Sequence, residues 1–339
     1  MNKPMDNKVF LSSRRGGEGV LSPQSRDYRI DSLKYCLIVL VIVGHVFNRE
    51  AFSEVKGCVV IWKWIYMFHM PLFIFISGYF SRKKEKKDFK ASILKLLEPL
   101  VVFQALALVL EYIHTGVISL IAIFTPWWAL WYLLSLIFWR LILQLLPDKL
   151  LENAPLLIGM SFCISILAGF LPFDKVLSLQ RTFAFLPFFF MGYSMKGKSI
   201  FLPDKYKPFS LAFLLIMFII PLFFAKYLGG LTHGDPYGSF LGAVQRVVVF
   251  GISIPMSIAF INVCPKNEWL ANQGRKTLQY YIYHAFMIPP LVLVITMLNL
   301  PATVLTALIL VITIIIVIKA LLRIAFINKL TNPSSLLKH

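Results

Sequence analysis

The sequence has little charge, and negative charge is especially scarce. Charged residues make up 15% of the 339 residues, and Asp and Glu number only 16 against 34 Lys and Arg. Soluble proteins carry roughly 25% charged residues. Apolar residues reach 58% and the mean hydropathy is +0.75. This composition excludes an ordinary soluble globular domain.

The positive charge has to be explained separately. A formal net charge of +18 could indicate a nucleic-acid-binding protein. Such a protein needs its basic residues on a solvated face, whereas here they form short clusters between apolar runs. That arrangement is typical of membrane topology. We therefore expect membrane lipids, and no nucleic acid, among the partners.

Cysteine is also scarce, and its positions indicate no metal or redox site. The four cysteines, Cys36, Cys58, Cys163 and Cys264, lie in or beside apolar stretches without metal-binding spacing. We expect no metal. The first apolar run, near Leu33, is not followed by a small-residue cleavage site, so it is predicted to be a retained membrane helix.

The apolar runs predict an all-α integral membrane protein with about ten transmembrane helices. About 20 apolar residues cross roughly 30 Å of hydrocarbon. This length predicts a single transmembrane domain over 30–324, between a polar N-terminal tail, 1–29, and a C-terminal tail, 325–339. The expected spans are 30–48, 58–80, 91–113, 127–146, 155–171, 180–195, 208–226, 240–262, 278–297 and 302–324.

Basic residues give the predicted orientation, since Lys and Arg concentrate in cytoplasmic loops. Seven lie in the segment up to Lys34 and seven more in 81–95, whereas 114–126 and 298–301 have none. Both termini are therefore predicted to be cytoplasmic. The 82–95 cluster is most simply an orientation signal, and the alternative is that some of its members also bind a ligand phosphate.

Two histidines are expected at the same depth in the membrane. Lys34 and His45 are eleven residues apart, which places them on one helix face about 16 Å apart along the axis. His69 lies thirteen residues before Arg82, about 20 Å from the same membrane edge. A lone intramembrane histidine is often structural and hydrogen-bonded. Two at one depth favour a functional site.

Two further ionisable residues are placed by the same count. Arg181 lies fifteen residues before Lys196, at about 22 Å, and is expected to join the histidines. His284 lies eight residues after Lys276 and is expected below that layer, nearer the cytoplasmic side. Pro71, two residues after His69, predicts a bent helix and a freed carbonyl near Met67.

The histidine segments resemble a known family. Asp31-Ser32-Leu33-Lys34, Val43-Gly44-His45 and the stretch FHMPLFIFISGYF over 68–80 look like the N-terminal signature of membrane acyltransferase family 3, closest to its fucose 4-O-acetylase-like branch. The segments 128–133, 186–193 and 274–284 follow in the same order. Lys34 stands where the family usually has arginine, so the charge is kept and the bidentate fork is lost.

The resemblance implies a bacterial inner-membrane O-acyltransferase that moves an acyl group, commonly acetyl from acetyl-CoA, to a hydroxyl of a cell-surface sugar or polysaccharide precursor. The implied partners are acetyl-CoA and a glycan acceptor. His45 and His69 are the expected catalytic residues, with His45 as the base. The expected coenzyme-binding residues are Lys34, Arg82, Lys83, Lys95, Arg181 and His284, and the expected substrate-binding residues are Asp31, Trp131 and Tyr132.

The alternative function is a polytopic transporter or flippase for a sugar or lipid-linked glycan. Intramembrane histidines and a proline-bent helix also serve proton relays. Against this reading, the sequence shows no pair of broken helices at matching places in two halves, which transporters often have. The acceptor sugar, the acyl group and the choice between direct and covalent transfer stay open at this level.

Overall fold

The computed structural model describes residues 28–173, 175–228 and 236–331. Most of the predicted N-terminal tail, and 332–339 of the C-terminal tail, lie outside these residues. The described chain is all-α, without a strand. Its α-helices are α1 (Tyr28–Phe47), α2 (Lys56–Tyr66), α3 (His69–Tyr79), α4 (Lys86–Thr115), α5 (Leu120–Phe124), α6 (Trp131–Leu145), α7 (Asp148–Glu152), α8 (Ala154–Ala168), α9 (Leu179–Ala184), α10 (Leu186–Ser194), α11 (Lys207–Ile216), α12 (Ile219–Phe224), α13 (Phe240–Val263), α14 (Glu268–Gly274), α15 (Thr277–Met297), α16 (Val304–Leu321) and α17 (Ala325–Leu330).

Eight helical segments in the described chain are long and apolar enough to cross a membrane, which confirms an all-α membrane protein. They correspond to eight of the ten expected spans. The other two, 155–171 and 180–195, form the 15-residue α8 and the broken pair α9 and α10. Large apolar side chains are exposed along the outer face of α4 and α16, among them Val109 and Ile312. An exposed apolar surface of this extent is unfavourable in water and is expected to lie against lipid.

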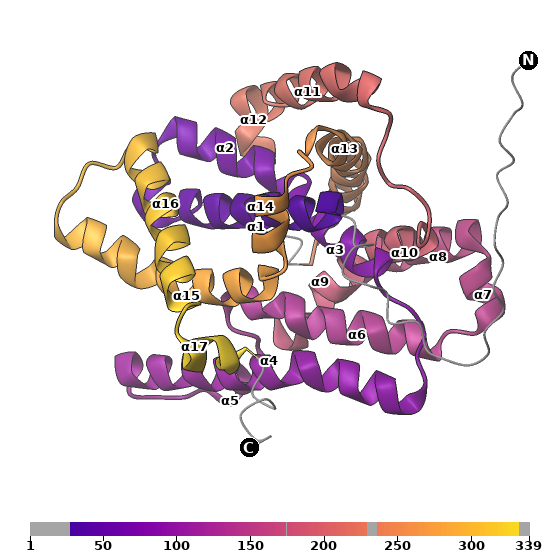
Figure 1. Ribbon diagram of the computed structural model, residues 1–339, viewed down its shortest axis with the longest axis horizontal. Coiled ribbons are helices and arrows are strands. Elements are labelled where there is room, and N and C mark those ends of the chain that lie inside the picture. The colour runs from indigo at the N-terminus through magenta and orange to yellow at the C-terminus, as the bar shows by residue number, and fades with distance from the viewer. Residues whose placement is uncertain (1–27, 174, 229–235, 332–339) are drawn as a thin grey trace, which may run out of the picture.

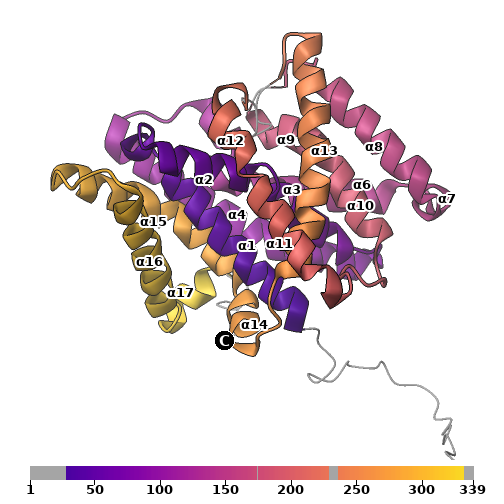
Figure 2. The ribbon, with the colours of Figure 1, turned by 90° about the horizontal axis from the view of Figure 1, so that it is seen from above.

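Helix α1 lies in the middle of the bundle. It packs against α2, α3, α14, α15 and α16 and crosses the centre of the molecule in Figure 2, whereas α4 runs along one edge next to α6 in Figure 1. The apolar window of α1 is 67% buried, but that of α16 is only 28% buried. Helix α1 is therefore surrounded by protein on most sides, and the bundle encloses the polar groups on this helix.

Three of the expected apolar spans are interrupted in the described chain; the sequence predicted the bend near Pro71 but not the other two, and 207–224 divides into α11 and α12. The segment 56–79 breaks at Met67 and Phe68, between α2 and α3, and the segment 179–194 breaks at Phe185, between α9 and α10. Helices α3 and α10 pack closely against each other. Broken helices of this kind also occur in transporters, so the breaks by themselves do not separate the two functions. Pro71 lies in the first turn of α3, where its missing N–H costs no helical hydrogen bond.

The 3₁₀ helix η3 (Trp128–Leu130) leads into α6 and contains an unusual backbone conformation. Trp128 has φ +35°, a left-handed value that bulky residues rarely adopt. A residue of α15 stabilises the next position, because the Tyr281 hydroxyl donates a hydrogen bond to the carbonyl oxygen of Ala129. This segment therefore joins α6 to α15 in the interior of the bundle.

Candidate active site

The two histidines expected to be catalytic line a small cavity of about 110 Å³. His45 comes from α1, Tyr66 from the end of α2, His69 from the start of α3 and Arg181 from α9. We call it the histidine cavity. Its remaining lining residues are Asn48, Met70, Trp128, Trp131, Phe185 and Tyr281. The structure thus brings His45 and His69 into one cavity, and Arg181 joins them there.

The hydrogen bonds of the imidazoles differ in what they fix. Nδ1 of His69 lies 2.9 Å from the carbonyl oxygen of Ile65, and Nδ1 of His284 lies 3.0 Å from that of Tyr280. A carbonyl only accepts, so in both rings Nδ1 carries the proton and Nε2 is left as an acceptor in the neutral form. Nδ1 of His45 instead lies 3.0 Å from the Tyr66 hydroxyl, which can donate or accept. His45 is therefore the one ring of these three whose partner permits either tautomer.

His284 lies at the level of His45, so the expectation that it lies below this layer is wrong. The two rings stack with centroids 5.3 Å apart and planes at 26°. Residue counting along α15 from Lys276 assumes an untilted helix, whereas the level of His284 relative to His45 depends on how α15 packs against α1. His284 is fully buried, and its Nε2 has no hydrogen-bond partner.

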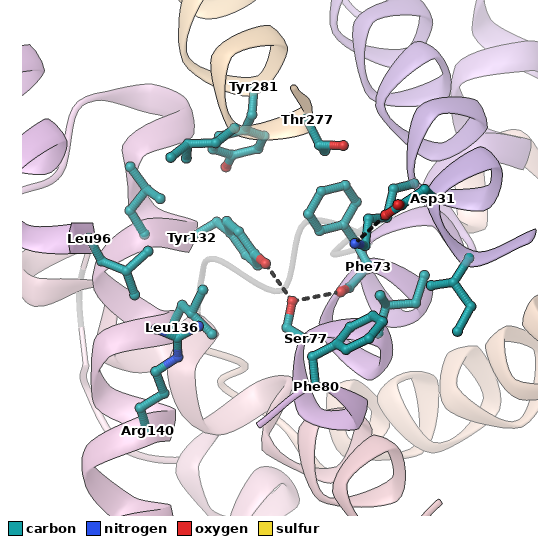
Figure 3. Close-up of a pocket in the computed structure, with 15 residues that line it drawn as sticks. Asp31, Phe73, Ser77, Phe80, Leu96, Tyr132, Leu136, Arg140, Thr277 and Tyr281 are labelled. Atoms are coloured by element: carbon teal, nitrogen blue, oxygen red, sulfur yellow. Dashed lines mark hydrogen bonds and ion pairs between the residues drawn. The ribbon is translucent and has the colours of Figure 1, made fainter. Parts of the chain in front are cut away.

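A second cavity of about 500 Å³ lies beside the histidine cavity and is mostly apolar. We call it the apolar cavity; Figure 3 shows its walls. Tyr132 of α6 hydrogen bonds to Ser77 of α3 across it, with 2.5 Å between the two oxygens. Lys34 and Asp31 of α1 form an ion pair of 2.9 Å on another wall. Tyr281 lines both this cavity and the histidine cavity, and so separates them.

A third cavity, of about 740 Å³, is strongly basic. We call it the basic cavity. It contains five cationic side chains, Arg82, Lys83, Lys84, Lys95 and Arg140, against two carboxylates, Glu85 and Asp88. Burial lowers the pKa of Lys84, and the positive charges of Arg140 and Arg82 lower it further. Leu96, Arg140 and Leu278 also line the apolar cavity, so the two cavities adjoin.

A fourth cavity, of about 410 Å³, reaches the histidine cavity at another part of its wall. We call it the tryptophan cavity. Trp127, Glu111 and Lys175 line it, and it shares Trp128 and Arg181 with the histidine cavity. The histidine cavity therefore has one neighbour across Tyr281 and a different one across Trp128.

Of the residues predicted from the sequence, all except His284 line at least one of these cavities. Arg82, Lys83 and Lys95 lie together in the basic cavity. Asp31 and Tyr132, expected to bind the substrate, lie with Lys34 in the apolar cavity, whereas Trp131 lies in the histidine cavity with the Arg181 guanidinium 5.1 Å above its ring.

The sequence missed several residues of these walls. Tyr66, Trp128 and Tyr281 belong to a chain with 15% aromatic residues, in which a single ring carries no signal. Tyr66 does lie three residues before His69, about one helical turn away, and this spacing could have suggested it. Arg140 reads as an anchor at a helix end, but it lies where the basic and apolar cavities meet.

Within the described residues, no group of three or more His, Cys, Asp or Glu side chains is placed to hold a metal ion. The side chains that meet in the histidine cavity are imidazoles, a phenol and a guanidinium. These groups accept, donate and move protons. Such a site suits acid–base chemistry at a buried position between two larger cavities.

The fold is that of a polytopic helical membrane protein, and its imidazoles line a small cavity between two larger ones. The sequence profile of the acyltransferase domain family, Acyl_transf_3, matches residues 27–322. The chain belongs to this family.

Curated relatives match over short stretches. The chain is 38% identical to nodulation protein NolL of Mesorhizobium japonicum over 82 residues, which are 23% of this chain and 21% of that protein. It is 41% identical to nodulation protein NolL of Sinorhizobium fredii over 59 residues, 17% of this chain and 16% of that protein. The chain thus matches about a fifth of the length of these relatives. No solved structure matches significantly.

Proposed function

We propose that this acyltransferase moves an acetyl group from cytoplasmic acetyl-CoA to a hydroxyl of a cell-surface sugar or polysaccharide precursor, in a bacterial inner membrane and with both termini cytoplasmic. One observation carries the proposal: the basic, apolar, histidine and tryptophan cavities follow one another, each sharing lining residues with the next. Membership of the acyltransferase family supports the reaction class.

The basic and apolar cavities fit the two halves of the donor. Coenzyme A has an anionic end with phosphates and a long, uncharged arm that ends in the thioester. The excess of cations in the basic cavity favours the phosphates, since Lys and Arg form charge-assisted hydrogen bonds with phosphate oxygens. The apolar cavity favours the arm, and Arg140 lies at the junction between them. The thioester would then reach the histidine cavity beside Tyr281.

The proposed reaction is a direct attack of the acceptor hydroxyl on the thioester carbonyl. His45 takes the hydroxyl proton at Nε2 while its Nδ1–H donates to the oxygen of Tyr66, 3.0 Å away. The new bond from oxygen to carbonyl carbon forms, the bond from carbon to sulfur breaks, and the coenzyme thiolate takes the proton from His45. In this proposal His69 shares the proton, and its Nε2 as an acceptor in the neutral form supports that role.

The tryptophan cavity is the proposed approach for the acceptor. It meets the histidine cavity at Trp128 and Arg181, away from the Tyr281 wall that faces the apolar cavity. Donor and acceptor would thus approach His45 through different cavities. With α1 starting in the cytoplasm, the basic cavity near its first turns would face the coenzyme pool.

The test is transfer of label from radiolabelled acetyl-CoA by purified protein, with methyl glycosides and a host envelope glycan fraction as acceptors. Label in alkali-labile ester, matched by free coenzyme A, supports the proposal. We expect His45→Ala and His69→Ala to abolish the ester at equal folded amounts. His114→Ala is the matched control, because His114 is exposed at the end of α4. If wild type neither binds acetyl-CoA nor forms ester, the proposal is refuted.

A further inference from the structure

Arg49 is a charged residue beside the histidine cavity that the reaction above does not use. It follows His45 by four residues, about one helical turn, just beyond the end of α1. Its guanidinium carbon lies 3.9 Å from the ring centroid of Trp128. Its Nε and Nη2 are buried without a hydrogen-bond acceptor. Because charged donors are costly to leave unpaired, the indole face is an important partner of this cation.

Trp128 is held in a conformation that needs such support. Its φ of +35° is strained for a bulky residue, and strained residues persist only where their surroundings over-determine them. Its ring lies 4.8 Å from the His45 ring at 71°, and 6.0 Å from that of His284. Since Trp128 lines both the histidine and the tryptophan cavity, its indole forms part of the wall between them.

The adjoining residue, Ala129, holds a second wall of the histidine cavity. Tyr281 separates the histidine cavity from the apolar cavity, and its hydroxyl donates to the carbonyl oxygen of Ala129. Trp128 and Ala129 are consecutive residues of η3. One short segment therefore sets both walls of the histidine cavity, and Arg49 is the cation that packs on it.

We propose that Arg49 is a positioning residue that holds the indole of Trp128 over His45 and keeps water in the tryptophan cavity away from that imidazole. This inference rests on the proposed function for one consequence. With the wall loosened, water replaces the acceptor hydroxyl: its oxygen bonds to the acyl carbon, the carbon–sulfur bond breaks, and His45 passes the water proton to the thiolate. Acetyl-CoA is then hydrolysed at the expense of transfer.

The primary test does not depend on activity. Diethyl pyrocarbonate carbethoxylates accessible imidazoles, and mass spectrometry gives the rate at His45, with exposed His114 as internal standard. We expect Arg49→Gln to raise the His45 rate about tenfold, because a half-buried cation–π contact shifts the equilibrium between the closed and the loosened wall by about that factor. Arg49→Lys keeps the charge but loses the planar stack, so its rise should be smaller. Lys226→Gln, which removes a cation 4.8 Å from Tyr227, is the matched control and should have no effect.

The double variant tests whether Arg49 acts through Trp128. Trp128→Ala removes the wall, so adding Arg49→Gln to it should raise the rate no further. An additive effect, or an unchanged His45 rate in Arg49→Gln, overturns the inference. If Trp128→Ala does not fold, the order of the Arg49→Gln, Arg49→Lys and wild-type rates decides by itself.

The second readout is the ratio of released acetate to acetyl ester, which should rise in Arg49→Gln by a factor similar to that of the His45 rate. A raised His45 rate without any transfer by wild type would refute the proposed function and leave the positioning role intact. Transfer by wild type with equal His45 modification rates in all variants would support the proposed function and refute the positioning role of Arg49.

Discussion

The contact between α3 and α10 leaves no room for a side chain, and Gly78→Ala tests it. A Cβ on Gly78 would lie 1.9 Å from the carbonyl oxygen of Phe189, and a Cβ on Gly192 would lie 1.9 Å from that of Phe75. Real Cβ contacts essentially never fall below 3.0 Å, so the two helices must separate by about 1 Å. Overpacking costs about 1–3 kcal/mol. Because the obstacle is backbone on both helices, we expect the upper end of that range.

The assay combines stability with function. Helix α3 carries His69 at its start and Ser77 next to Gly78, so the same displacement should lower transfer as well as the thermal unfolding midpoint in detergent. Gly159→Ala is the matched control on α8, since nothing lies within 4 Å of its added Cβ. It should be neutral or stabilise by up to about 1 kcal/mol. Equal midpoints and equal transfer in the two variants would refute this account of the α3–α10 contact.

Three further predictions concern the reaction and the donor. Tyr66→Phe removes the hydroxyl 3.0 Å from His45 Nδ1 and should lower kcat about 10- to 100-fold without changing KM for acetyl-CoA. An unchanged kcat would exclude a catalytic role for this hydrogen bond. Arg140→Gln should weaken coenzyme A binding about tenfold by calorimetry and leave pantetheine binding unchanged, because its guanidinium would hold phosphate; equal losses for both ligands would contradict that role. Burial lowers the pKa of Lys84, and Arg140 and Arg82 lower it further. Bound phosphate favours the ammonium form, so coenzyme affinity should be highest below this lowered pKa and fall as the pH rises through it. Lys84→Met should remove this pH dependence, and a wild-type affinity that stays constant up to about pH 10 would refute the role of Lys84.

The sequence predicts the class of fold and the proximity of His45 and His69. Long apolar runs need no tertiary information, because the bilayer thickness alone sets their length. The depth of His45 and His69 follows from helical rise, and the structure brings both into the histidine cavity. Their catalytic roles stay a prediction.

Other features depend on packing that no periodicity encodes. His284 was misplaced because its level relative to His45 depends on how α15 packs against α1, two helices far apart in the chain. Arg49 and Trp128 are 79 residues apart in the numbering, and their contact involves a residue with a left-handed φ. A tryptophan in an aromatic-rich sequence gives no sign of this conformation.

The helix breaks explain why the site could not be built from ideal helices. Irregular backbone at membrane depth is tolerated only where protein or a cavity satisfies its polar groups. At the break between α2 and α3, the carbonyl of Ile65 faces Nδ1 of His69, and the carbonyl of Met67, the position expected from Pro71, accepts the hydroxyl of Ser253. The first contact sets the tautomer of the imidazole, and the second ties the break to α13. The interruption that would be costly in lipid is therefore what orients His69 beside Tyr66 and His45.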